Sequence, residues 1–400
     1  MHVRTAITRT LLFLLTRLVP PSEAAEAVRN RAEFSALCWF WRIHVTADMI
    51  LETTDHQHLS PESLIKHRML VEWLEDDGNH AAWGLDARLS AALWYLNETE
   101  RDTAQKMYDA FKQKRQEFAQ LEKAIQQKAN ETRRVLETVR TRFRMAAYGH
   151  TRKDEPSERW MEEAYSRDTK RSDACTLKNT RLPGQPYAGS SLVNDLLCLC
   201  LAGRPGGGDD NAQICGAELE QKDWKFTWTD STGFVPEGWA EKAWSIMGPA
   251  CGQVQRPTDL TEKNILAASN HFESLIGTNP NPNRDKFPWV LGYSGQGQEG
   301  ATRRVCSANA GRPNEAWGQC VHYANTTGGG RGRIDWLQAF YDLLPQVRQY
   351  EALQRELEGL DWKVKALSQD LEEAFEEAGF KNQAPRKPHH GLPLLVWLLL

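Results

Sequence analysis

A long stretch without glycine or proline most constrains how this chain can fold. It runs from Leu85 to Tyr148 and is rich in Glu, Lys, Gln, Arg and Ala, which favour helices. Apolar residues recur along it at spacings of three, four and seven, the pattern of a helix with a coiled-coil seam. The seam positions are Phe111, Phe118, Leu121, Ile125, Val135, Leu136, Val139 and Phe143. A helix over about 85–148 would be roughly 90 Å long.

A second heptad pattern follows Pro345 and predicts a helix over about 346–378. Its apolar positions alternate four and three apart: Leu353, Leu357, Leu360, Val364, Leu367, Leu371 and Phe375. A shorter apolar helix is expected within about 28–60, with Phe34, Leu37, Trp41 and Val45 on one face. Because a folded lobe separates the two long helices, they can return antiparallel and bury their seams on each other.

The lobe, about 175–330, holds most of the glycine, proline and cysteine. The chain has eight cysteines: Cys38, Cys175, Cys198, Cys200, Cys215, Cys251, Cys306 and Cys320. An even number in an exported chain predicts four disulfides. Cys198 and Cys200 are too close in sequence to bridge each other without strain, so each should have a different partner. Cys38 lies outside the lobe, so it either pins the N-terminal helix to the middle of the chain or stays free.

These patterns predict a mainly α fold. We expect an elongated antiparallel coiled-coil hairpin or bundle with a loop-rich, disulfide-stapled head lobe, in one domain over 25–378. The eight cysteines allow about 105 pairings, and the sequence does not choose among them.

The two ends of the chain have the composition of targeting signals. Residues 1–24 carry Arg4 and Arg9 near their start, followed by an apolar run and then by small residues. This order predicts a cleaved signal peptide. The last nine residues are apolar, but about 20 are needed to span a membrane. Small residues, a polar spacer and this tail predict a GPI-attachment signal, with Asn382 as the attachment site and 383–400 as the removed propeptide. The alternative is a tail that packs into a helical bundle.

Charge and motifs argue against several classes of function. The formal net charge is −4, whereas a nucleic-acid-binding face normally carries a basic excess. The sequence has no HExxH, no phosphate-binding loop ending in GK[ST], and no complete GxSxG elbow. We therefore expect no enzyme activity, and no catalytic, cofactor-binding or metal-binding residues. Three sequons predict N-glycosylation sites: Asn325, Asn130 and Asn97. The heptad phase places Asn97 on the seam and Asn130 outside it.

The segment 173–203, DACTLKNTRLPGQPYAGSSLVNDLLCLCLAG, is similar to the core of the N-terminal domain of African trypanosome variant surface glycoproteins. The helical layout, the Cys-rich lobe and the C-terminal signal also resemble this family, and the B-type domain most of all. No cysteine follows Cys320, so the resemblance implies a branch without a separate Cys-rich C-terminal domain.

The resemblance implies a homodimeric, GPI-anchored coat glycoprotein on the extracellular face of the plasma membrane. Such a coat shields the cell from host antibodies and changes by antigenic variation. With the C-terminal helix leading down to the lipid, the lobe would point away from the membrane. The alternatives are a nutrient receptor on the same scaffold, of the transferrin or haptoglobin–haemoglobin type, and an anchored or secreted enzyme. Surface copy number separates an abundant coat protein from a sparse receptor.

Overall fold

The computed structural model shows two compact units within one chain. The disulfide unit comprises Met1–Thr46 and Thr141–Leu344, and the hairpin unit comprises Ala47–Arg140 and Pro345–Leu400. The structure describes residues 30–56, 98–149, 165, 169–177, 185–201, 215–216, 228, 238–256, 259–278, 288–293, 306, 319–324 and 330–377.

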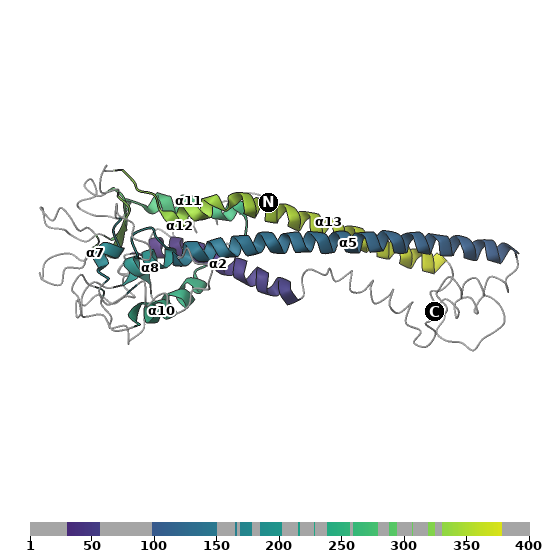
Figure 1. Cartoon of the computed structure of the whole chain (residues 1–400), viewed down its shortest axis with the longest axis horizontal. Helices are drawn as coiled ribbons and strands as arrows, with labels where there is room; N and C mark the ends of the chain where they lie inside the picture. The colour runs from purple at the N-terminus through teal and green to yellow at the C-terminus, as the bar shows by residue number, and fades with distance from the viewer. Residues whose placement is uncertain are drawn as a thin grey trace, which may run out of the picture. The chain divides into compact units, whose positions relative to one another are not determined.

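Two long helices form the hairpin unit. Much of α5 (Glu98–Tyr148) runs beside α13 (Leu344–Glu377), and the N-terminal end of α5 extends beyond the end of α13, as Figure 1 shows. Lys114 pairs with Asp370, and Lys128 pairs with Glu356, each with an N–O distance of 2.7 Å. Lys128 lies 14 residues after Lys114, whereas Glu356 lies 14 residues before Asp370. The helices are therefore antiparallel, as predicted.

The seam between these helices is apolar. Phe118 and Ile125 of α5 are buried with Val364 and Leu367 of α13. Three half-buried leucines pack against them: Leu121, Leu357 and Leu360. All seven were predicted seam positions. Because burying a large aliphatic or aromatic side chain contributes about 1.5–3 kcal/mol, the seam is the main source of stability for helices whose other faces are polar.

Helix α2 (Arg31–His56) contributes residues to both units. In the hairpin unit its Asp48 forms an ion pair with Arg140 of α5, at 2.8 Å. Ala47 and Leu51 are buried beside it. The predicted short apolar helix is thus present, and Phe34, Leu37 and Trp41 of its predicted apolar face are buried in the disulfide unit.

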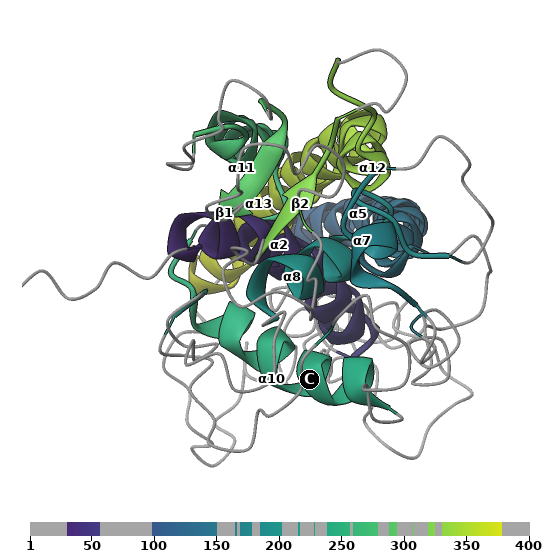
Figure 2. The ribbon, with the colours of Figure 1, turned by 90° about the vertical axis from the view of Figure 1, so that its left-hand side faces the viewer.

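The disulfide unit is built from short helices around two strands. Helix α8 packs against strand β2 and against α10, and Figure 2 shows it lying between the strands and α10. The elements are α7 (Arg171–Ala174), α8 (Leu192–Cys200), α10 (Trp239–Gln253), α11 (Glu262–Leu275), β1 (Val290–Tyr293), β2 (Gln319–His322) and α12 (Asp335–Asp342). The heptad pattern did not predict these elements, because even the longest of them, α10 with 15 residues, covers only about two heptads.

The two strands pair antiparallel, with Leu291 opposite Val321 and Gly292 opposite Cys320. Gly292 has φ of 88°, a backbone conformation that glycine adopts without strain. A Cβ atom there would lie 2.5 Å from the Leu199 side chain and 2.8 Å from the Gln319 carbonyl oxygen. Glycine is therefore required for α8 to approach the sheet this closely.

An aromatic cluster joins four helices of the disulfide unit. Phe40 of α2 contacts Phe272 of α11, with ring centroids 6.2 Å apart, and Phe340 of α12 at 4.9 Å. Phe340 also stacks on Phe143 of α5. Trp336 lies 5.0 Å from both Phe40 and Phe272. These mostly edge-to-face contacts each add about 0.5–1.5 kcal/mol beyond the burial of area.

Helices α12 and α13 are separate because of Pro345. Proline lacks an N–H group and is tolerated in the first turn of a helix but not in its interior. Accordingly, α12 ends at Asp342 and α13 begins at Leu344, so that Pro345 occupies its first turn.

The predicted mainly α fold is confirmed. Helix α5 covers Glu98–Tyr148 of the range expected to be helical, while 85–97 lie outside the described residues. The predicted C-terminal heptad helix is α13, which extends to Glu377.

Candidate functional site

Helix α8 is the centre of the disulfide unit, and it is formed by the motif SLVNDLLCLC. Ser191 caps its N-terminus, and the Ser191 hydroxyl oxygen accepts a hydrogen bond from the Asn194 N–H at 3.1 Å. All nine helical residues are buried. A helix that is buried on every face lies inside a core, so the rest of the unit encloses the helix that this motif forms.

Asp195 places a carboxylate in this core. One of its oxygens accepts hydrogen bonds from the Gly189 N–H at 2.9 Å and the Asn194 side-chain amide at 3.3 Å. The other accepts from the Tyr323 hydroxyl at 2.8 Å and the Trp336 indole N–H at 2.6 Å. Burial raises the pKa of Asp195 to about 6, although the four donors act in the opposite direction.

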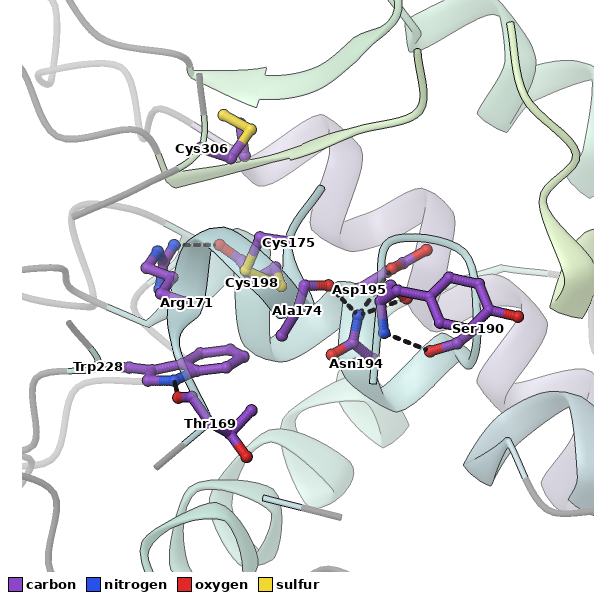
Figure 3. Close-up of a disulfide and its surroundings, with 12 residues drawn as sticks. Thr169, Arg171, Ala174, Cys175, Ser190, Asn194, Asp195, Cys198, Trp228 and Cys306 are labelled. Carbon is purple, nitrogen blue, oxygen red and sulfur yellow. Dashed lines mark hydrogen bonds between the residues drawn. A yellow bond between two sulfur atoms is a disulfide. The ribbon is translucent and has the colours of Figure 1, made fainter. Parts of the chain in front are cut away.

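Asn194 connects the segments on the other side of α8. Its amide nitrogen donates to the carbonyl oxygens of Ala174 at 2.9 Å and Tyr187 at 3.0 Å. Its side-chain oxygen accepts from the Tyr165 hydroxyl at 3.1 Å. Figure 3 shows Asn194 and Asp195 beside each other, and Asn194 reaching towards Ala174. Together, the two residues connect α8 to five other stretches of chain, at Tyr165, Ala174, Tyr187–Gly189, Tyr323 and Trp336.

A buried cation closes the other end of this core. Arg171 is fully buried, donates a hydrogen bond to the Cys198 carbonyl oxygen, and lies 5.6 Å from the centre of the Trp228 ring. The Trp228 indole N–H donates to the Thr169 carbonyl oxygen at 2.9 Å (Figure 3). A cation over an aromatic face is attracted by the ring quadrupole, so Trp228 helps to hold Arg171 in place.

Asn30 connects α2 to the sheet and to α8. Its amide nitrogen donates to the carbonyl oxygens of Leu199 at 2.9 Å and Gln319 at 2.7 Å, while its oxygen accepts from the Tyr293 N–H at 2.9 Å. Every one of these groups is a backbone atom of another element. Asn30 therefore satisfies one backbone group in each of α8, β2 and β1.

The four predicted disulfides are present, and every cysteine is bonded. The pairs are Cys38–Cys251, Cys175–Cys198, Cys200–Cys215 and Cys306–Cys320. Cys198 and Cys200 have different partners, as predicted from their spacing. Of the two options for Cys38, the bridge to the middle of the chain is the one observed, and Cys38 is not free.

The side chains of Asn194 and Asp195 bond to other buried side chains and to backbone groups. The part of the chain that the structure describes holds no group of three His, Cys, Asp or Glu residues arranged for a metal ion. Across the same residues, no helix is long and apolar enough to cross a membrane.

The predicted modification sites are mostly outside the described residues. Asn97, Asn325 and Asn382 lie there, together with residues 1–24 and 383–400. Asn130 is described: it lies in α5 with its side chain exposed, in agreement with the heptad phase. Whether any of these residues is modified stays a prediction.

Sequence reasoning did not single out Asp195, Asn194, Arg171 or Asn30. A signal was available for two of them, because Asn194 and Asp195 interrupt an apolar run, and buried polar side chains need partners. Arg171 and Asn30 lie in segments of ordinary polarity, and nothing in the local sequence marks them as buried.

Comparison with known proteins agrees with this architecture. Residues 72–366 match the family model described as the trypanosomal VSG domain, in its B-type form. The chain is 22% identical over 395 residues to the variant surface glycoprotein YnAT 1.3 of Trypanosoma congolense, covering 94% of this chain and 88% of the relative. The match extends across both units and includes α8 with its two disulfides. The chain therefore belongs to the trypanosomal variant surface glycoprotein family, as a surface coat glycoprotein with a B-type domain.

Proposed function

We propose that this protein is a GPI-anchored coat glycoprotein that shields the cell surface from host antibodies and takes part in antigenic variation. The family match over 72–366 carries the proposal. The name of the Trypanosoma congolense relative describes that protein as a variant surface glycoprotein. Such a function is steric and antigenic, so it needs no catalytic residue.

The four disulfides support the export that this proposal requires. Disulfides persist in extracellular and secretory compartments and are rare in the cytosol. The proposal includes cleavage of a signal peptide at about residue 24 and attachment of the lipid at Asn382. These two steps would place the protein on the extracellular face of the plasma membrane without a transmembrane helix.

We also propose that the protein acts as a homodimer, as the resemblance implies. Sedimentation equilibrium of the released protein tests this at micromolar concentration. A mass equal to one chain plus its glycans would contradict it.

Release from intact cells by a phosphatidylinositol-specific phospholipase C tests the anchor. We expect the protein to enter the supernatant, and mass spectrometry of its C-terminal peptide to show Asn382 carrying the glycolipid remnant. A protein that stays on the cells with Leu400 present would overturn the anchor. Quantitative mass spectrometry of surface copies tests the coat role, because a few thousand molecules per cell would indicate a receptor.

A further inference from the structure

The sequon Asn130-Glu131-Thr132 lies in the middle of α5, where its two recognition groups are separated. Successive residues of an α-helix are rotated by about 100° around the axis, and residues i and i+2 do not face each other. The side chain of Asn130 is exposed, whereas Thr132 is fully buried. The amide that receives the glycan and the hydroxyl two residues later therefore lie on opposite faces of the helix.

The hydroxyl of Thr132 is also engaged. It donates a hydrogen bond to the carbonyl oxygen of Lys128 at 2.9 Å. A threonine hydroxyl bonded to the carbonyl four residues earlier stays folded back on its own helix. To act with Asn130 as one acceptor motif, Thr132 would have to break this bond and leave the buried face.

The middle residue of the sequon is tied to the partner helix. The ammonium group of Lys128 lies 3.2 Å from a carboxylate oxygen of Glu131 and 2.7 Å from one of Glu356 in α13. These partners raise the pKa of Lys128. Opening the backbone at the sequon would therefore disturb the contact of this turn of α5 with α13.

We propose that Asn130 accepts an N-linked oligosaccharide only while α5 is unfolded, and that formation of the α5–α13 hairpin closes the site. In the transfer, the Asn130 amide nitrogen forms a bond to C1 of a lipid-linked oligosaccharide. The bond between C1 and the pyrophosphate oxygen breaks, the polyprenyl pyrophosphate leaves, and the amide nitrogen loses one proton.

A glycan added before folding would not prevent the hairpin from forming. Asn130 points away from the seam, and its helical neighbours Gln126, Gln127, Arg133 and Arg134 are exposed polar residues. The sugar would therefore extend into solvent from the outer face of α5. The folded protein can therefore carry a glycan at Asn130, but it cannot receive one there.

An assay with purified components tests the proposal. The chain is made in a host without N-glycosylation and offered, with a lipid-linked oligosaccharide, to solubilised oligosaccharyltransferase. One sample is folded with its disulfides intact, and the other is reduced, alkylated and unfolded. A synthetic peptide of residues 126–134 is the reference acceptor, because so short a segment does not form a stable helix in water.

Glycopeptide mass spectrometry should find Asn130 occupied in the peptide and in the unfolded chain, and at least about tenfold less in the folded chain, because helix formation separates the two groups. Gln127→Pro, which breaks the surrounding turn, should restore occupancy in the folded sample. Thr132→Val should abolish occupancy in every sample. Equal modification of the folded and unfolded chains would overturn the proposal, and so would no modification of either chain while the peptide reacts.

The inference rests on the proposed function in one respect, since only an exported chain meets the transferase. The assay itself needs no export. A negative result in the assay therefore counts against the acceptor site, whereas failure of the chain to reach the cell surface counts against the proposed function.

Discussion

Asp195 is a buried carboxylate whose four hydrogen-bond partners are all neutral. Each partner offers an N–H or O–H group, so these hydrogen bonds favour the ionised form, although burial outweighs them and raises the pKa of Asp195 to about 6. Only the Tyr323 hydroxyl can also accept. This single residue links α8, the turn at Gly189, the end of β2 and α12.

Replacing Asp195 with asparagine should therefore destabilise the protein. The new amide would direct N–H groups at existing donors, and a buried donor without an acceptor costs about 1–3 kcal/mol. We expect a loss of about 1–3 kcal/mol, measured as the free energy of unfolding in urea. Asp259→Asn is the matched control, because the Asp259 side chain is exposed. A loss as large in the control would contradict this role for Asp195.

Two buried groups of the disulfide unit should make the free energy of unfolding depend on pH in opposite directions. The pKa of Asp195 is raised from 3.8 to about 6 by burial, so its contribution to stability is full below pH 3.8 and is lost as pH rises through 6. The pKa of His322 is lowered from 6.5 to about 4 by burial. Its contribution is present above pH 6.5 and is lost as pH falls through 4.

Because these contributions are opposite in sign and similar in range, they should nearly cancel between pH 4 and 6.5. Thermal unfolding across this range measures the balance. Relative to the unsubstituted protein, Asp195→Asn should lose stability as pH falls, and His322→Gln should gain it. Two variants with the same slope would show that one of the assignments is wrong.

At the residue scale, the sequence predicted that the cysteines would form disulfides, but it did not predict which residues would contact each other. Spacing alone excluded a bridge between Cys198 and Cys200. It could not show that Asn30 would reach three backbone groups on three other segments, because those contacts depend on how the short elements assemble. Burial of Arg171 was unpredictable for the same reason.

At the scale of elements, long periodic helices were predictable and short ones were not. The seam of α5 and α13 repeats over many residues, so each position reinforces the same period. Strands β1 and β2 have four residues each, which is too short for a pattern of alternation to be recognised. Helix α8 could be suspected only as an apolar run, which fits a buried strand equally well.

The seam makes a direct prediction about stability. Ile125 is almost fully buried between α5 and α13, and an isoleucine-to-alanine change in a core costs about 2–5 kcal/mol. Ile125→Ala should lower the free energy of unfolding by an amount in this range, monitored by circular dichroism at 222 nm. Gln126→Ala, on the exposed face of the same turn, should change it by less than about 0.5 kcal/mol.

The antiparallel register can be tested by zero-length cross-linking. A carbodiimide should join Lys114 to Asp370 and Lys128 to Glu356, since each pair is already in contact. It should not join Lys114 to Glu356, which would lie about 20 Å further along the helix at 1.5 Å per residue. Peptide mapping that finds Lys114 joined to Glu356 would contradict the register.

At the scale of the whole molecule, one disulfide closes a far longer loop than the others. Cys38–Cys251 spans 213 residues, whereas Cys306–Cys320 spans 14. A cross-link that closes a longer loop removes more conformational entropy from the unfolded chain.

Removing the long-range bridge should therefore cost more than removing the short one. In the chain-entropy model the difference between loops of these lengths is about 2 kcal/mol. The variants Cys38→Ala/Cys251→Ala and Cys306→Ala/Cys320→Ala can be compared by urea unfolding under non-reducing conditions. An equal or larger loss for the short loop would mean that local packing, and not loop length, determines these contributions.

The pairing of α5 with α13 also affects the order of events during synthesis of the chain. Lys114 and Asp370 are 256 residues apart, so α5 emerges from the ribosome long before its partner has been synthesised. At about 5–20 residues per second, the delay is about 10–50 s. Throughout this interval the apolar stripe of α5 has nothing from α13 to cover it. Because exposed apolar surface makes incomplete chains prone to aggregate, each new molecule is most exposed to aggregation in the interval before α13 has been made.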